Sequence, residues 1–220
     1  MNELEKFCRA FVAHKYHLDD EGEAKAKKNS ENLYSAKAYT INPIHFIYNT
    51  ILFWNSEPIG EEVLMKVNPG LVIGGTYDSY TDDSAAQCYR INADKSKVAE
   101  YWQIGNLPLF VASEGKNRVR LFQRHNLMIK AKVQKMSFPP PDSLQLHQSL
   151  FKDEYLFSCS DDKFTDRKAE MVRSLYPEIM LPLFGAYGVR IGSRRFALSP
   201  LFRKRSTIEQ AIESGFTKGR

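Results

Sequence analysis

The sequence predicts an α/β fold, in stricter usage α+β, in which helices flank a small mixed sheet. Apolar residues at helical spacing predict an opening amphipathic helix that ends before His17; they are Leu4, Phe7, Phe11 and Val12. Short apolar runs at residues 63–67 and 71–73, bounded by Gly and Pro, predict strands. A length of 220 residues suits a single domain over 1–220, with additions at both ends of a smaller core.

The segments before that core predict a second helix, a hairpin and a loop. Asn42 followed by Pro43 is a typical helix start, and apolar residues then recur on one face. Residues 68–70 form a turn that would join the two strands as a hairpin. Residues 76–84 are polar, and their three aspartates lack the flanking His that would complete a metal cluster.

The core occupies residues 86–136, where strand and helix signals alternate most densely. The expected order is strand, helix, strand, turn, helix and strand, at 88–91, 92–104, 107–111, 113–115, 116–126 and 127–133. The turn therefore joins a buried strand to a basic helix.

This turn has the chemistry of an anion site. A helix start exposes unpaired backbone N–H groups and the positive end of the dipole, and Gly115 has no side chain to keep a ligand away. Lys116 and Arg118 add positive charge, and a guanidinium can grip two phosphate oxygens at once. The competing interpretation is a plain helix cap with solvated cations.

The core as a whole resembles the ParB/sulfiredoxin superfamily. Leu107-Pro108-Leu109 is similar to that family's hydrophobic-Pro-hydrophobic strand, and Gly115-Lys116-Asn117-Arg118 to its Gly-x-x-Arg turn. The chain departs from the best-known members at Lys116, which stands where sulfiredoxin has its catalytic cysteine and where partitioning ParB proteins have an acidic residue. Sulfinic acid reduction and chromosome partitioning are therefore not expected, and Glu114 is left as the nearest acidic residue.

In size and in its single core, the chain resembles the plasmid fertility-inhibition branch, which includes the oncogenic suppression activity protein. That resemblance implies a monomeric fold, ATP hydrolysis, DNA cleavage, and a block on conjugative or T-DNA transfer by a rival system at its coupling protein. ATP with Mg²⁺ is the implied cofactor, and the charge of the phosphates favours a divalent ion.

The residues assigned to this chemistry surround the turn. The catalytic candidates are Glu114, Lys116 and Arg118. The phosphate-binding candidates are Gly115, Lys116, Asn117 and Arg118, and the candidate metal ligand is Glu114. The DNA-binding candidates are Arg120, Arg190, Arg194 and Arg195.

A basic C-terminal extension over residues 143–220 carries most of those arginines. Glycines, aromatics and arginines alternate over 183–195, a pattern that suits a phosphate backbone with bases stacked on Phe184 or Tyr187. The pattern equally describes a β-hairpin turning at Gly192-Ser193, with its arginines outside. A helix is expected before it, over 165–176.

Composition leaves the partner open. The net charge of +5 permits an anionic partner without requiring one, and three widely spaced cysteines argue against a disulfide framework. The charged N-terminus lacks a signal peptide, and the apolar stretch 44–54 is too short to span a membrane. We expect a cytoplasmic protein, or one peripheral at the inner membrane. The alternatives to the enzyme are a non-catalytic binding module that docks on a partner protein and, third, a sequence-specific repressor.

Overall fold

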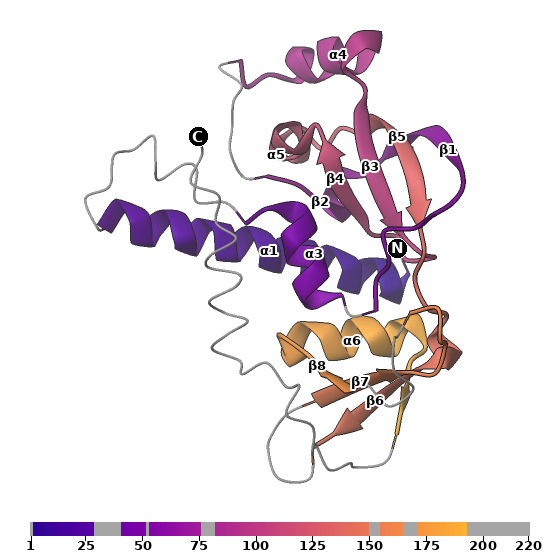
Figure 1. Ribbon diagram of the computed structural model, residues 1–220. Coiled ribbons are helices and arrows are strands. Elements are labelled where there is room, and N and C mark those ends of the chain that lie inside the picture. Colours follow the sequence, from indigo (N-terminus) through magenta and orange to yellow (C-terminus); the bar gives the residue numbers. More distant parts are fainter. Residues whose placement is uncertain are drawn as a thin grey trace.

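The computed structural model describes residues 2–28, 41–51, 53–75, 82–149, 155–164 and 171–192. Within these ranges the chain forms five α-helices and two mixed β-sheets, one of five strands and one of four (Figure 1). The α+β fold class predicted from the sequence is confirmed.

The larger sheet has the strand order β1-β5-β3-β4-β2. Its strands are β1 Pro58–Val67, β2 Val72–Ile73, β3 Ala99–Ile104, β4 Phe110–Glu114 and β5 Ile129–Met136. β5 is antiparallel to β1 and parallel to β3, while β4 is antiparallel to β3 and parallel to β2. Buried residues alternate along most of β5, because one face of the sheet meets the core.

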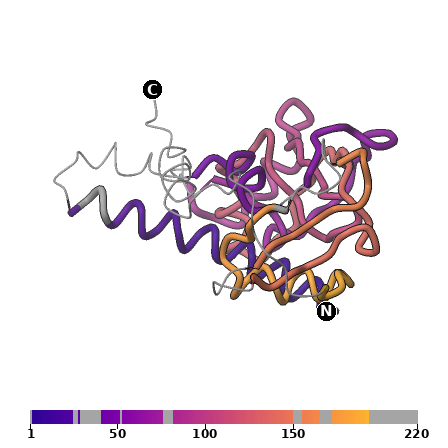
Figure 2. The backbone as a smooth tube through the Cα atoms, turned by 60° about the horizontal axis from the view of Figure 1, so that its bottom comes forward, coloured from indigo at the N-terminus to yellow at the C-terminus, as the bar shows by residue number. Residues whose placement is uncertain are grey.

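The helices are α1 Glu3–Lys28, α3 Pro43–Thr50, α4 Ala85–Ala93, α5 Val119–Arg124 and α6 Pro177–Tyr187. The predicted start of α3 is confirmed, because the Asn42 side chain accepts the Ile44 N–H at 2.9 Å. α1 lies between the larger sheet and α6, against which it packs (Figure 1). Figure 2 shows its later turns extending past the strands.

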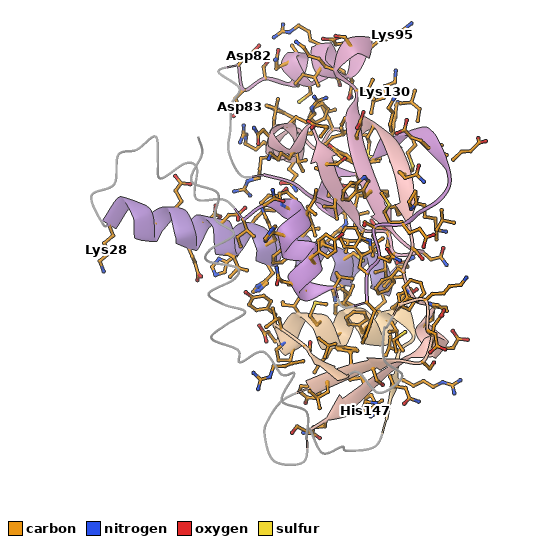
Figure 3. The ribbon with its side chains drawn as sticks, in the orientation of Figure 1. Lys28, Asp82, Asp83, Lys95, Lys130 and His147 are labelled. Atoms are coloured by element: carbon orange, nitrogen blue, oxygen red, sulfur yellow. The ribbon has the colours of Figure 1, made fainter. Side chains whose placement is uncertain are left out.

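The smaller sheet belongs to the C-terminal extension. Its order is β8-β7-β6-β9, with β6 Leu144–Gln148, β7 Tyr155–Cys159, β8 Met171–Arg173 and β9 Arg190–Ile191. α6 packs on this sheet through Phe184, whose ring centroid lies 4.6 Å from that of Phe157. His147 of β6 is buried and bonds the Ser158 hydroxyl at 3.0 Å (Figure 3).

Two expectations for the N-terminal part are wrong. The opening helix does not end before His17 but continues to Lys28. The apolar pattern missed this continuation because two of the buried residues on its inner face, Lys15 and Asp19, are polar. Residues 63–67 and 71–73 do not form a hairpin. The turn Pro69–Leu71 leads instead from β1, which pairs with β5, to β2, which pairs with β4.

The first two elements of the core are exchanged relative to the prediction. Residues 88–91 belong to α4, whose start is capped by Ser84, and residues 99–104 form β3. Tyr101 is fully buried while Glu100 is exposed, the alternation of a half-buried strand. The neighbouring aromatics Tyr101 and Trp102 fit either spacing, and pairing with β4 and β5 decides for the strand.

The C-terminal expectations also change. Residues 171–173 form β8 rather than the end of a helix, and residues 183–187 lie in α6 rather than in a hairpin strand. Phe184 is buried and therefore does not offer its ring to a base. β9 pairs in parallel with β6, so among the described residues the predicted hairpin is absent.

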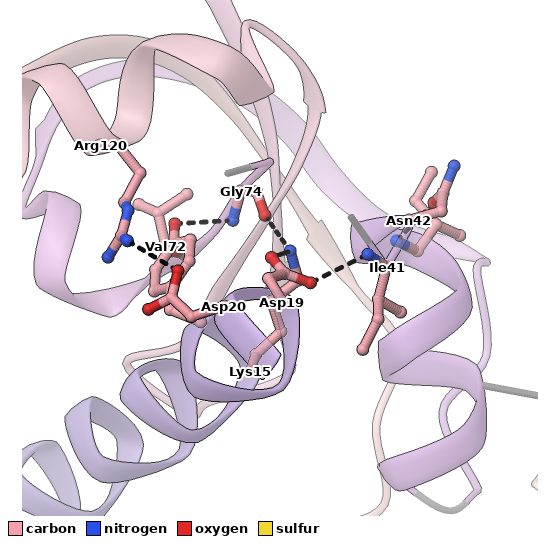
Figure 4. Close-up of polar contacts among 10 residues, drawn as sticks. Lys15, Asp19, Asp20, Ile41, Asn42, Val72, Gly74 and Arg120 are labelled. Atoms are coloured by element: carbon pink, nitrogen blue, oxygen red, sulfur yellow. Dashed lines mark hydrogen bonds and ion pairs between the residues drawn. The ribbon is translucent and has the colours of Figure 1, made fainter. Parts of the chain in front are cut away.

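A buried ion pair ties α1 to both neighbouring segments (Figure 4). The Lys15 ammonium contacts the Asp19 carboxylate and donates to the Gly74 carbonyl at 2.7 Å. The other Asp19 oxygen accepts the Ile41 N–H at 2.9 Å, just before α3. Burial lowers the pKa of Lys15, and the Asp19 carboxylate opposes that shift.

Replacing Asp19 by Ala should lower the free energy of unfolding by about 3–5 kcal/mol, because it leaves the buried ammonium without its carboxylate. Asp20→Ala is the matched control, since Asp20 is 55% exposed and its pair with Arg120 is worth at most about 1 kcal/mol. Urea denaturation measures both variants. Equal losses would contradict the special weight given to Lys15 and Asp19.

His14 lies where α1 packs on α6. Its ring lies 4.4 Å from that of Tyr176, and burial lowers the pKa of His14 below its ordinary value of 6.5, with Glu178 opposing the shift. The unfolded chain therefore takes up a proton first, and stability should fall as the pH drops through about 6.5. His14→Phe, which keeps a ring there, should flatten this dependence in denaturation curves. An unchanged slope would exclude His14 as its source.

Candidate functional site

The turn between β4 and α5 is the candidate site, and it lies later in the chain than predicted. The strand forms at Phe110–Glu114 rather than at 107–111, so Leu107-Pro108-Leu109 precede the strand, and Ser113 and Glu114 belong to it rather than to the turn. The α-helix begins at Val119 rather than at Lys116. β4 ends at Glu114, Gly115 adopts a left-handed φ of +75°, and Lys116–Arg118 form a single 3₁₀ turn that leads into α5. Glu114 and Lys116 are exposed. Among the described residues, the backbone N–H groups of Lys116 and Asn117 make no hydrogen bond, which leaves two unpaired donors at the turn.

The Arg118 guanidinium folds back over this turn. Its Nη1 donates to the Lys97 carbonyl, and a Cβ added to Gly115 would lie only 2.8 Å from its Nε. The Nε atom is buried and has no hydrogen-bond partner in the described part of the chain. Arg118 is thus held beside Gly115, with part of its hydrogen-bonding capacity already used by Lys97.

The end of β2 holds the turn from the other side. The Gly75 N–H donates to the Lys116 carbonyl at 3.1 Å. A Cβ on Gly74 would lie 2.8 Å from that same carbonyl oxygen, and one on Gly75 would lie 2.9 Å from the Asn117 side-chain oxygen. The approach requires glycine at Gly74, because a side chain there would meet the backbone of the turn, whereas at Gly75 the Asn117 side chain would have to move.

Glu100 is a candidate residue that the sequence analysis missed. It is the register partner of Glu114 across β3 and β4, and it is also exposed. The Ser113 hydroxyl donates to the Glu100 carbonyl at 2.9 Å, which joins the two strand ends. The expected helix over 92–104 hid this pairing. Mg²⁺ commonly uses one or two carboxylates together with substrate phosphates, so Glu100 and Glu114 are the candidate ligands.

The aspartates near the start of α4 have other partners. Asp82 pairs with Arg90, and Asp83 contacts Arg124 and His125 at the end of α5 (Figure 3). The hydrogen bond from His125 lowers the pKa of Asp83. Across the described ranges, no group of three or more His, Cys, Asp or Glu residues is placed to hold a metal ion.

Arg120 points away from the turn, toward α1. It contacts Asp20 at 3.3 Å and lies 4.7 Å above the Tyr16 ring (Figure 4). There it borders a pocket of about 360 Å³ between α1 and α5. The lining residues are Arg9, Val12, Ala13, Tyr16, His17, Asp20, Gly70, Arg120 and Gln123.

The other predicted DNA contacts are not brought to the turn. Arg190 is exposed in β9, in the smaller sheet on the far side of α1 and α6 (Figure 1). Arg194 and Arg195 lie outside the described residues. The structure therefore gathers Glu114, Gly115, Lys116, Asn117 and Arg118 in one place, and leaves Arg120 and Arg190 elsewhere.

Cysteine chemistry has no place at this turn. Cys8, Cys88 and Cys159 are free and buried, and burial raises the pKa of each thiol, that of Cys8 to about 12.

None of the helices in the described ranges is long and apolar enough to cross a membrane. The chain matches no family model, no curated protein and no solved structure.

Gly115→Ala and Gly60→Ala form a matched pair, because both residues have a positive φ, +75° and +71°. Each change should cost about 1–2 kcal/mol for the left-handed backbone. Gly115→Ala should cost about 1 kcal/mol more, because its methyl group would meet Arg118 whereas the space around Gly60 is open. Urea denaturation tests this. Equal losses would show that Arg118 moves aside freely.

Proposed function

We propose that the chain binds the phosphate groups of a nucleotide or of DNA at Gly115–Arg118, and hydrolyses a phosphoester there. The observation that carries this proposal is the convergence at one turn of two unpaired N–H donors, a left-handed glycine and two cations. These groups supply what a phosphate needs, namely backbone donors, positive charge and close backbone access.

The roles follow from position. Lys116 is exposed and offers its ammonium group, while Arg118 is held over Gly115 and offers its remaining guanidinium N–H groups. Both would stabilise the negative charge that develops on a transferred phosphoryl group. Glu114 and Glu100 would hold Mg²⁺ against the phosphate oxygens, and the ion would neutralise charge on the leaving group.

The wider proposal is a ParB-like ATPase and DNase of the fertility-inhibition kind. Its partners would be DNA, a nucleotide and a coupling protein of a rival transfer system, met in the cytoplasm or at the inner face of the membrane. The supporting features are the order of β4, turn, α5 and β5 and the glycine turn itself. Because α4 and β3 stand where the superfamily pattern has a strand and then a helix, the similarity to that superfamily rests on the second half of the core.

One observation favours a second candidate, a binding module without chemistry. The bond of Arg118 to the Lys97 carbonyl and its contact with Gly115 are what a structural arginine would make. Such a protein would hold a phosphate on Lys116 and the backbone, and act by docking on a partner.

The two candidates differ in turnover. Wild type should release phosphate from ATP and nick supercoiled DNA with Mg²⁺, and chelation should abolish both reactions. Lys116→Ala should reduce the rate about 100-fold, the usual effect of removing one charge-stabilising group. Glu114→Gln and Glu100→Gln should each raise the Mg²⁺ concentration needed. Lys6→Ala, which removes an exposed lysine of α1, is the control and should react as wild type does.

Binding must be measured beside turnover, by titration of a fluorescent nucleotide or oligonucleotide. Saturable binding that Lys116→Ala weakens, without any turnover by wild type, would establish the binding module and reject the enzyme. Turnover that survives unchanged in both Lys116→Ala and Arg118→Ala would place the chemistry elsewhere. If wild type shows no binding and no turnover, the proposed site is rejected.

A further inference from the structure

β1 is an exposed edge strand with an apolar surface. Among the described residues it pairs with β5 alone, on one side, and forms the outer edge of the larger sheet (Figure 1). Its first nine residues are all exposed, and four of them are large and apolar: Ile59 at 47%, Val63 at 56%, Leu64 at 55% and Met65 at 39%. An edge of this kind presents unpaired backbone groups and apolar side chains to another strand.

The pairing with β5 shows which way these side chains point. Val63 and Met65 are opposite Val133 and Ala131, which are buried, so they lie on the core face of the sheet. Leu64 is opposite the exposed Lys132, on the other face. The core face of the larger sheet therefore continues to its edge with apolar residues that β5 alone does not cover.

We propose that β1 pairs with β1 of a second copy of this chain, antiparallel and about a two-fold axis at Leu64. In this register Leu64 lies opposite the partner's Leu64, and Val63 lies opposite the partner's Met65. Glu62, which belongs to the irregular part of β1 between Ile59 and Val63, comes within reach of the partner's Lys66. Apolar residues meet apolar residues and opposite charges meet, twice by symmetry.

The charges on β1 favour a second copy of this chain as the partner, and they favour one alignment of the two strands. Lys66 makes no ion pair within the described ranges, while Glu62 contacts Lys132 of its own chain at 3.2 Å and remains 43% exposed. Moving the register by two residues in either direction places Leu64 opposite the partner's Glu62 or Lys66. The register centred on Leu64 avoids both mismatches and keeps the two core faces on the same side.

Such a dimer would join the two larger sheets into one and satisfy the edge of each. The contact is short, so it falls at the small end of protein interfaces, below about 1,200 Å². We therefore expect a reversible, concentration-dependent dimer rather than an obligate one. The proposal is independent of the phosphate site and departs from the monomer that the family resemblance implies.

Cysteine cross-linking tests the register directly. Leu64→Cys should form a disulfide-linked dimer under mild oxidation, because residues opposite each other have Cα atoms about 4.5–5.5 Å apart. Ile59→Cys is the control: it is on the same exposed strand, beyond the irregularity between Ile59 and Val63, and should lie too far from its own copy for a disulfide. Wild type should not cross-link, since all three native cysteines are buried. Equal cross-linking of the two variants, or none, would overturn the proposed register.

Charge exchange tests the pairing of Glu62 with Lys66 by sedimentation. Lys66→Glu should weaken the dimer about tenfold, since it turns two attractions into repulsions. Adding Glu62→Lys to that variant should restore most of the affinity. A wild type that stays monomeric over its whole concentration range, or a double variant as weak as Lys66→Glu alone, would overturn the proposal.

Discussion

Lys15 and Asp19 form a buried ion pair on the inner face of α1, and three parts of the chain are arranged around it. The ammonium reaches the Gly74 carbonyl at the end of β2, and the carboxylate receives the Ile41 N–H before α3. Two unpaired charges in this position would cost several kcal/mol, so the three segments must meet in one geometry for the pair to form. The polar centre thereby specifies the arrangement of the surrounding apolar core.

This constraint also reaches the candidate site. Gly74 and Gly75, whose position Lys15 helps to define, pack directly against Lys116 and Asn117. Tyr16 adds to the same connection, because its hydroxyl accepts a hydrogen bond from the Gly74 N–H at 3.2 Å and the Arg120 guanidinium lies over its ring. The turn at Gly115 is therefore supported from α1 through β2, and its shape depends on residues about 100 positions earlier in the sequence.

The same α-helix lies between the larger sheet and α6. Above α1 lies the larger sheet with the turn at one end and the open edge β1 at the side, and below it lies the smaller sheet on α6 (Figure 1). Because β1 and the turn are on opposite sides of β5 and β3, a second copy at the edge would leave Gly115 open to a ligand. Binding of phosphate and pairing of copies are thus compatible in one molecule.

The amino-acid sequence by itself determined the local elements: the capped start of α3, the glycine turn with Lys116 and Arg118, and β5. These depend on interactions between residues only a few positions apart. From the sequence alone we predicted a strand where α4 lies and a helix where β3 lies. Tyr101 and Trp102 fit the spacing of either element, and only pairing with neighbouring strands decides between them. Only the tertiary structure decided that Glu100 stands beside Glu114, that Arg118 bonds Lys97, and that Arg120 turns to α1. Each of those contacts joins segments whose pairing no local spacing encodes.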